Sequence, residues 1–423
     1  MGFSFLLPIF VTFVGGYFLF RLRFFFILHP IRTAKRLALA LKERKSRRSL
    51  SLALAGTLGV GNIFGVAVGI IIGGEGVLFW LLVSAVFASV IKYAEALCVA
   101  DLGESGGMAA LIRRRYPLFA GFASRLYSVL CLLVALVMGS AVQSGSVLSL
   151  AERAVGAPSG VAASFFAVLV LIVTLGGRRK ITDATESIIP LTTVIYILLS
   201  FAVIFVNFEA LPGAVSKIFS SAFSPSAAVG GGFIFLSTRA LSEGYARGIL
   251  SNEAGAGTSS MAHASCGADP VTAGLFGVCE VFFDTPLLCT LTGLVIVSSV
   301  DSPSSYSSAM ALVFDAFSFS LGSYAALAVF VCVFLFAYST VICWYYYGEE
   351  SLVYLTGRKM KWLYTPIFTA FIFVGAFSDS FFIVSLCDVI LLLMTALTLI
   401  ALLLSSRRIV SLSGDGGVIK PKK

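Results

Sequence analysis

The sequence predicts an all-α polytopic membrane protein with eleven transmembrane helices, and its composition is the first evidence. Of the 423 residues, 58% are hydrophobic and only 12% are charged, and the mean hydropathy is +0.99. Soluble domains carry about 25% charged residues, so this composition excludes an ordinary water-soluble protein. The apolar runs are also long and continuous, whereas an outer-membrane barrel would show short segments of alternating hydrophobicity.

Each expected span is an apolar run of about the 20 residues that a helix needs to cross a bilayer. In chain order the runs are 3–20, 50–72, 76–101, 122–150, 159–176, 187–207, 227–250, 270–299, 321–347, 362–379 and 381–404. The first run is expected to be retained as a span, because Arg21 and Arg23 follow it. A cleavable signal carries its positive charge before the apolar run.

The distribution of basic residues predicts the orientation. Alternate loops between these spans contain 25 of the 30 Lys and Arg residues. Cytoplasmic loops carry the excess of Lys and Arg, so the N-terminus is expected outside and the C-terminus in the cytoplasm. The basic stretch 30–48 is expected to be a cytoplasmic connector. It either lies on anionic lipid headgroups or is a solvated topology signal.

The sequence lacks the residues that several classes of function require. The eight cysteines are scattered without a CxxC pair, and the only histidines are His29 and His263. This pattern predicts no disulfide framework, no zinc or redox site, and no catalytic cluster of a membrane enzyme. The net charge of +9 is explained by the basic loops, so no nucleic-acid partner is predicted, and no protein partner either.

The span 50–72 is expected to be interrupted near its middle. Gly56, Gly59 and Gly61 lie within six positions and are followed by Asn62. Each glycine lowers helix propensity by about 1 kcal/mol relative to alanine, which favours an unwound stretch. Exposed backbone at that depth is tolerated only where it is buried in protein or lines a cavity. The later glycines at four-residue spacing are expected to serve close helix packing instead; they are Gly65, Gly69 and Gly73.

A second interruption is expected directly after the span 227–250. Residues 251–259 hold a carboxylate, an amide, hydroxyls and glycines, although a plain cytoplasmic loop is the alternative. The two interruptions begin two five-helix halves of opposite orientation, which is the pattern of an inverted repeat. Interrupted helices in corresponding positions of two halves indicate a secondary-transporter site. The expected units are 1–29 (N-terminal helix), 30–48 (connector), 49–210 and 211–405 (repeats), and 406–423 (cytoplasmic tail).

Six collinear motifs between about residue 8 and residue 405 carry a family resemblance. They are 53–66 (Ala-Leu-Ala-Gly-Thr-Leu-Gly-Val-Gly-Asn-Ile-Phe-Gly-Val), 79–80, 92–95 (Lys-Tyr-Ala-Glu), 246–257, 283–285 (Phe-Asp-Thr) and 336–349. The chain resembles the sodium:alanine/glycine symporter family. The resemblance implies a leucine-transporter-like fold in the inner (plasma) membrane. It also implies sodium-coupled import of small neutral amino acids, alanine or glycine first, by alternating access, with sodium as the co-transported ion and no other cofactor.

The resemblance also implies roles for individual residues. The substrate would be bound by Thr57, Gly59, Gly61, Gln143, Ser251, Asn252 and Gly255, with the N–H groups of Gly59 and Gly61 at its carboxylate. Sodium would be bound by the Ala55, Leu58 and Phe336 carbonyls and by the Asn62, Ser339 and Thr340 side chains. The residues alone would instead favour bonds from Ser339 and Thr340 to carbonyls one turn earlier.

Acidic residues inside the spans are functional candidates, because a charge in the bilayer is costly. Glu253, Glu280 and Asp284 are possible coupling or structural acids, and in a rival reading one of them makes the chain a proton-coupled permease of the same fold. A scaffold or receptor that binds without transport is a third hypothesis. Two ion pairs are expected, Lys92 with Glu95 and Arg247 with Glu253.

Two departures from the family pattern leave the substrate and the coupling stoichiometry open. Ser144 and Gly145 follow Gln143 where the family usually has Ala-Asn, and they are expected to reshape the pocket. In the last span, the plain apolar run 391–398 replaces a stretch that usually contains Asn and Pro.

Overall fold

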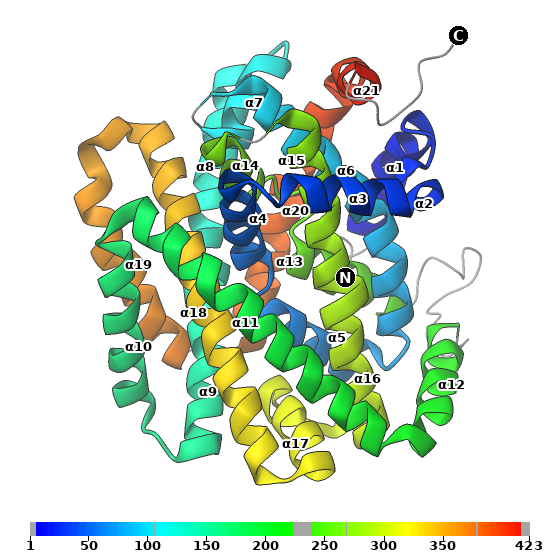
Figure 1. The fold of residues 1–423 in the computed structure, drawn as a ribbon. Helices are drawn as coiled ribbons and strands as arrows, with labels where there is room; N and C mark the ends of the chain where they lie inside the picture. The colour runs from blue at the N-terminus through cyan, green and yellow to red at the C-terminus, as the bar shows by residue number, and fades with distance from the viewer. Residues whose placement is uncertain (1–5, 105, 224–238, 268, 378–379, 416–423) are drawn as a thin grey trace.

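The computed structural model describes residues 6–104, 106–223, 239–267, 269–377 and 380–415, and within these ranges the regular structure is entirely helical. Figure 1 shows the helices gathered into one bundle with most axes running along its long direction. The predicted all-α class is therefore confirmed for the described residues.

Six helical segments are long and apolar enough to cross a membrane: α6 (Val77–Leu102), Ala120–Val155, α11 (Gly177–Val206), Pro270–Ser299, α18 (Ser323–Thr356) and most of α20 (Ser380–Leu404). The second consists of α8 (Ala120–Leu136), η2 and α9 (Gln143–Val155), and the fourth of α15 (Pro270–Phe282), η6 and α16 (Thr290–Ser299). A seventh is the bent pair Arg44–Thr57 and Gly61–Gly73. Shorter apolar helices are α1 (Leu6–Arg21), α10 (Ser159–Thr174), α17 (Ala309–Leu321) and α19 (Lys361–Phe377). A multi-pass helical protein is thus supported, and the count of eleven spans stays a prediction.

Two segments differ from the predicted set of spans. The helix α17 lies in a segment expected to be a loop. Residues 227–238 of the expected span 227–250 lie outside the described residues, and the remainder belongs to α13 (Arg239–Asn252). The remaining short elements are α2 (Phe25–Leu28), α3 (Pro30–Ala40), α7 (Gly107–Arg115), η3 (Phe208–Ala210), α12 (Leu211–Ala222), α14 (Ser260–Cys266), η7 (Pro303–Ser305), η8 (Gly357–Met360) and α21 (Ser406–Asp415).

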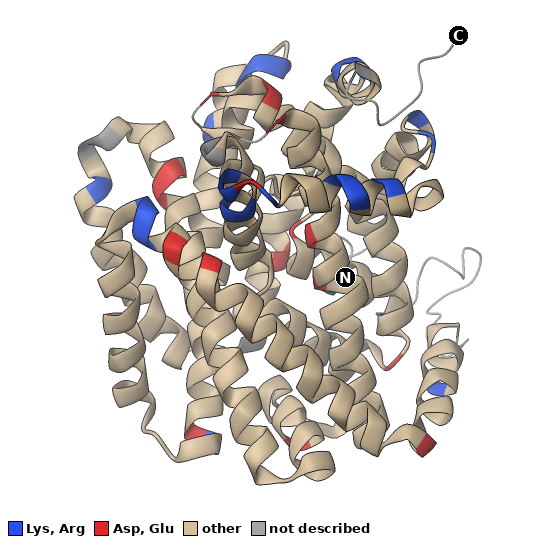
Figure 2. Ribbon diagram, in the orientation of Figure 1, with Lys and Arg blue, Asp and Glu red and all other residues tan. Residues whose placement is uncertain are grey.

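The basic residues gather at one end of the bundle, as the loop analysis predicts. Figure 2 shows blue segments on α3, at the start of α4 (Arg44–Thr57), on α7 and on α21, all toward the same end. The connector predicted for 30–48 contains α3 and the first turn of α4. Which side of the membrane this end faces stays a prediction from the positive-inside rule.

The first predicted break is present. The helix α4 ends at Thr57, and the chain resumes as the π-helical turn η1 (Gly61–Gly65) and then α5 (Val66–Gly73), bent by 44° from α4. The interruption is shorter than the expected stretch 56–62. Gly56 is inside α4, where an added Cβ would lie 2.9 Å from the Tyr347 ring, so this glycine permits close packing. The packing role expected of Gly65 is not observed, because a Cβ there would meet nothing closer than 4.0 Å.

The second predicted break is present as well. The helix α13 ends at Asn252, and α14 begins only at Ser260. Glu253 has φ 55°, and Gly255 and Gly257 have φ 91° and 74°. Left-handed backbone is uncommon for a residue other than glycine, so Glu253 stores backbone strain of about 1–3 kcal/mol that its surroundings must offset.

The helix α6 joins both breaks to the rest of the bundle. It packs against α13 and α15 through small residues: a Cβ at Gly248 would lie 2.4 Å from the Ser84 hydroxyl, and one at Gly277 would lie 2.7 Å from the Lys92 carbonyl. Such close approach between helices is the common packing mode inside membranes, where apolar burial gives no advantage over lipid. The polar residues of α6 are therefore held next to the second break.

Candidate functional site

The two breaks face each other inside the bundle. A Cβ at Gly61 in the first break would lie 3.5 Å from Cα of Ser251 at the end of α13, which is ordinary van der Waals contact. Asn62, Ser251 and Asp284 are all buried. Three segments near the breaks contain a π-helical turn: η1, η2 (Val137–Val142) and η6 (Phe283–Cys289). Such turns are frequent at functional sites, because they leave backbone groups outside the regular helical bonds.

Asp284 is the centre of a hydrogen-bond network between the breaks. Its carboxylate accepts from Nδ2 of Asn62 at 2.5 Å, and from the hydroxyls of Ser251 at 2.9 Å and Thr285 at 2.6 Å. Cys289 also lies against Asn62 and Ser251. The acid expected only as a coupling or structural group thus contacts one residue from each break. Its partners could not be read from sequence, because they come from three segments.

Asn62 fixes the backbone of its own break. Its Oδ1 accepts from the N–H of Gly59 at 3.0 Å while its Nδ2 donates to Asp284. The N–H expected to meet a substrate carboxylate at Gly59 is therefore engaged by Asn62 here. The neighbouring N–H of Val60 donates to Oε1 of Gln143 at 3.0 Å, which brings Gln143 to the break as expected.

Two of the expected sodium ligands approach each other where α4 ends beside α18. The Thr340 hydroxyl is 3.5 Å from the Leu58 carbonyl, so the first break and α18 approach each other through oxygen atoms. The Ser339 hydroxyl donates to the Phe336 carbonyl at 2.9 Å, which is the local bond that the residues alone favour. Ala55 is buried one turn before Leu58. The Thr57 hydroxyl bonds within α4, to the Ala53 and Leu54 carbonyls at 3.3 and 3.4 Å.

The residues expected at the second break divide between two sides. Asn252 donates from Nδ2 to the Thr285 hydroxyl at 3.0 Å and so belongs to the Asp284 network. Gly255 lies on another side, because a Cβ there would be 2.6 Å from Cγ2 of Thr395 on α20. The Glu253 carboxylate accepts from the Thr258 hydroxyl inside the break. The segment is an ordered turn between α13 and α14 rather than a plain loop.

The predicted ion pair of Lys92 with Glu95 is wrong. Lys92 donates to the Asn252 carbonyl at 2.8 Å, and Glu95 accepts from the N–H of Gly255 at 2.6 Å. These two α6 side chains satisfy backbone groups that the interruption leaves without helical partners. Unsatisfied backbone is costly away from water, which explains why these contacts replace the local pair.

The predicted pair of Arg247 with Glu253 is also wrong. Arg247 forms ion pairs with Asp388 and, at 3.2 Å, with Glu243 one turn earlier. The effect expected of Ser144 and Gly145 on the pocket stays a prediction, and both residues contact α19. The Ser144 hydroxyl lies 3.1 Å from the Ile372 carbonyl, and Gly145 packs against the backbone of Gly375, so both residues shape the α9–α19 contact.

Glu280 belongs to a separate buried cluster. Its Oε1 lies 2.5 Å from Nε2 of His263, whose Nδ1 lies 2.8 Å from the Ser49 hydroxyl. Its Oε2 lies 3.8 Å from the Lys92 ammonium. The cluster therefore ties α4, α6, α14 and α15 together. Sequence reasoning set His263 aside as an isolated histidine, and only its position next to the second break could have drawn attention to it.

Replacing Glu280 by glutamine is expected to lower thermal stability strongly. The change removes the buried anion beside Lys92 and His263, and breaking a buried pair costs about 3–5 kcal/mol. Thermal unfolding of the purified protein in detergent measures the effect. Glu104→Gln is the matched control, because Glu104 and Arg114 form an exposed pair whose loss costs about 1 kcal/mol or less. Equal shifts in the two variants would contradict the structural role of the cluster.

Comparisons with known proteins agree with this architecture. The sodium:alanine symporter family model matches residues 1–415. The sodium/alanine symporter AgcS of Methanococcus maripaludis is 33% identical over 86% of this chain and 82% of its own. A probable sodium/glutamine symporter, GlnT of Bacillus subtilis, is 30% identical over 93% of this chain and 84% of its own.

Solved structures agree at the level of the fold. The crystal structure of MhsT in complex with L-phenylalanine covers 86% of this chain and 88% of its own, with a TM-score of 0.62 and 14% identity. At that identity the likeness concerns the leucine-transporter-like fold alone. The match of the family model over nearly the whole chain identifies a transporter rather than an enzyme. This chain belongs to the sodium:alanine symporter family.

Proposed function

We propose that the protein is a sodium-coupled symporter that imports a small neutral amino acid, alanine or glycine first. The observation that carries the proposal is the meeting of the two broken helices at Gly61 and Ser251, with Asp284 hydrogen-bonded between them. Transporters of this kind place the substrate at half-helix N-termini and the ion at unwound carbonyls near the midplane. The match to a sodium/alanine symporter supports the same substrate class.

The proposed substrate site lies between the breaks. The backbone at Gly61 offers the N-terminal end of η1 to a carboxylate, since a helix N-terminus favours an anion. Ser251 and Asn252 at the end of α13 offer a hydroxyl and an amide to the other end of the amino acid. Gln143 holds the backbone between Gly59 and Gly61 in place through its bond to the N–H of Val60. In this proposal Thr57 and Gly255 support the two breaks, because the Thr57 hydroxyl bonds within α4 and Gly255 packs against Thr395.

The proposed sodium site joins the first break to α18. Its oxygen ligands are the carbonyls of Ala55, Leu58 and Phe336 and the hydroxyls of Ser339 and Thr340, with Asn62 near a second ion. The 3.5 Å approach of the Thr340 hydroxyl to the Leu58 carbonyl supports this assignment. An ion there would draw α4 and α18 together. Alternating access would then move one helix bundle against the other around the site, with the N-terminus outside and the C-terminus in the cytoplasm.

Replacing Thr340 by alanine is expected to raise the sodium concentration for half-maximal uptake about tenfold or more, because an oxygen bound to a charged group is lost. Uptake of labelled alanine and glycine into proteoliposomes measures this, under an inward sodium gradient and under an equal potassium gradient. Thr356→Ala on the same helix is the control, since the Thr356 hydroxyl bonds locally to the Leu352 carbonyl. Equal uptake with potassium, or a Thr340 variant with normal sodium dependence, would overturn the sodium assignment.

Proton coupling on the same fold is the second candidate, and the buried Asp284 favours it. A carboxyl group between the two breaks can bind a proton, and this proton would then be the coupling ion instead of sodium. Uptake driven by an inward proton gradient in sodium-free buffer would support this candidate. Uptake that requires sodium at every pH would exclude it.

A further inference from the structure

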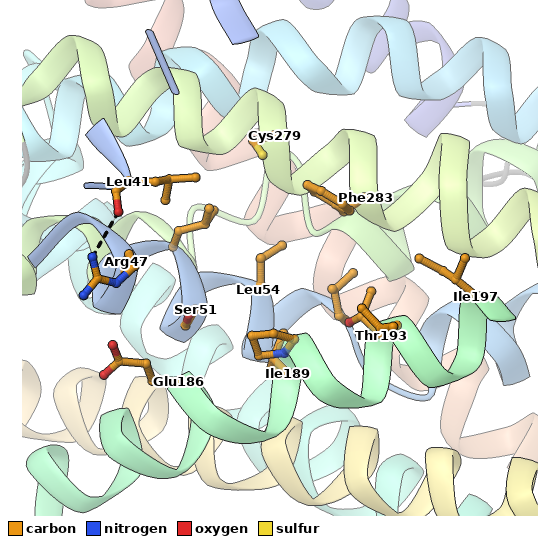
Figure 3. Close-up of a pocket in the computed structure, with 14 residues that line it drawn as sticks. Leu41, Arg47, Ser51, Leu54, Glu186, Ile189, Thr193, Ile197, Cys279 and Phe283 are labelled. Carbon is orange, nitrogen blue, oxygen red and sulfur yellow. Dashed lines mark hydrogen bonds between the residues drawn. The ribbon is translucent and has the colours of Figure 1, made fainter. Parts of the chain in front are cut away.

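A cavity of about 550 Å³ lies behind the first break, and Leu58 lines it whereas the other residues of the proposed substrate and sodium sites do not. Figure 3 shows its walls: Leu54 from α4, Ile189, Thr193 and Ile197 from α11, and Phe283 from η6 turn toward one space. The volume is within the range of small-molecule sites, about 300–1,000 Å³. The cavity extends from Arg47 at one end to Leu58, the residue whose carbonyl approaches Thr340.

The walls suit an apolar occupant. Most of the lining side chains are aliphatic or aromatic, and the charged ones, Arg47 and Glu186, lie together at one end (Figure 3). A zwitterionic amino acid or a bare ion inside would leave its charges without partners, which is costly. The cavity is therefore a poor route for the proposed substrate and a good site for a hydrocarbon chain.

The cavity opens toward the surface where lipid lies. Val194 lines it and is 55% exposed, and Pro190 lines it and is exposed too. Their neighbours Leu191 and Leu198 give α11 an apolar outer face, with 60% and 65% exposure. An exposed apolar helix face of this kind is expected to contact acyl chains in a membrane protein. A lipid chain can thus reach the cavity from the side.

The charged end of the cavity carries the guanidinium of Arg47. Residues 42–48 contain five basic residues and one acidic residue. The α11 acids Asp183 and Glu186 both pair with Arg48. Arg47 donates from Nη1 to the Leu41 and Lys42 carbonyls at 3.1 and 3.0 Å, and within the described ranges it forms no ion pair with an acidic side chain. The mouth of the cavity therefore offers a guanidinium to an anion.

We propose that this cavity binds an anionic phospholipid, with one acyl chain between α4 and α11 and the phosphate headgroup at Arg47. Apolar walls, a lateral opening and a basic mouth together select this ligand over a neutral lipid, since basic clusters next to the membrane attract anionic headgroups. The bound chain packs behind Leu58 and holds α4 against α11 beside the first break. The site is independent of which amino acid or ion the protein carries.

Photo-crosslinking of the full chain in nanodiscs tests the proposal. The discs consist of phosphatidylcholine with a small fraction of a photoreactive lipid. In one set this lipid is phosphatidylglycerol with a photoreactive acyl chain, and in the other it is phosphatidylcholine with the same chain. Labelled peptides are identified by mass spectrometry. Labelling of the lining residues of α4 and α11 is expected to be at least about fivefold stronger with phosphatidylglycerol. Equal labelling by the two lipids, or no labelling of the lining residues, would overturn the proposal.

Two matched pairs of variants locate the site. Ile197→Trp fills the cavity and is expected to remove the labelling, whereas Leu198→Trp, on the adjacent outer face, is expected to retain it. Arg47→Gln is expected to lower the preference for phosphatidylglycerol about fivefold, and Arg44→Gln, outside the cavity lining, less than twofold. Thermal unfolding checks that all four variants are folded. Labelling that survives in folded Ile197→Trp would contradict the proposed site.

Discussion

Replacing Asp284 by asparagine is expected to abolish sodium-driven uptake while leaving a folded protein. The carboxylate accepts hydrogen bonds from Asn62, Ser251 and Thr285. An asparagine keeps one acceptor oxygen and turns an NH₂ group toward donors. Each buried donor left without an acceptor costs about 1–3 kcal/mol, so losing even one of these bonds weakens the closed arrangement of the breaks by about fivefold to more than a hundredfold. Asn62 would also lose the bond that orients it toward the N–H of Gly59.

Substrate and sodium titrations of uptake in proteoliposomes measure the effect. Asp315→Asn is the control, because Asp315 on α17 pairs with Arg153 away from the breaks. The control is expected to stay within about twofold of the unmodified protein, as loss of such a pair costs about 1 kcal/mol or less. Thermal unfolding separates a site defect from misfolding. An Asp284 variant with ordinary substrate and sodium titrations would show that the network does not form the site.

The fold class and both interruptions could be predicted because their causes are local. Hydropathy alone indicates membrane helices, and a concentration of glycines such as Gly56, Gly59 and Gly61 weakens a helix wherever it lies. Tertiary packing then decides which of these glycines unwind: Gly56 stays helical against Tyr347, and the interruption contracts to Leu58–Val60. The extra helix α17 is not predicted, because Ala309–Leu321 has only 13 residues, fewer than the 20 or so that a helix needs to cross a bilayer.

The contacts of the site could be predicted only in part, because they join segments far apart in sequence. The resemblance brought Gln143, Ser251 and Thr340 to the breaks, and the structure shows each of them in contact there. It gave no reason to expect that Asp284 would be shared by Asn62 and Ser251. The roles of these residues in binding remain proposals.

Charged residues were the least predictable. Spacing alone favoured a pair between Lys92 and Glu95, as for any opposite charges one turn apart on a helix. In the folded chain both side chains bind the backbone of the second break instead. A break deep in a membrane protein leaves N–H and C=O groups without partners, and satisfying them outweighs a local pair worth a few tenths of a kcal/mol. A buried charge beside a predicted break is therefore better assigned to the break than to its helical neighbour.

Replacing Gly59 by alanine is expected to reduce uptake to near background. An added Cβ would lie 2.5 Å from the Thr340 hydroxyl, closer than side chains tolerate, and 3.1 Å from Oε1 of Gln143, which is a tight contact. The first break and α18 would have to separate, which would disturb the proposed substrate and sodium sites together. Uptake of labelled alanine and its sodium dependence, measured in proteoliposomes, report the loss.

Gly65→Ala is the matched control for this change, because it adds the same methyl group six residues later in open space, with nothing closer than 4.0 Å. Alanine is the better helix former by about 0.5–1 kcal/mol, so this variant is expected to transport normally and to unfold at an equal or higher temperature. Comparing the two variants separates the effect of losing a glycine from the effect of a methyl group that clashes with Thr340 and Gln143. If both variants transported alike, the contact of Gly59 with Thr340 and Gln143 would be dispensable. The first break would then serve helix packing alone.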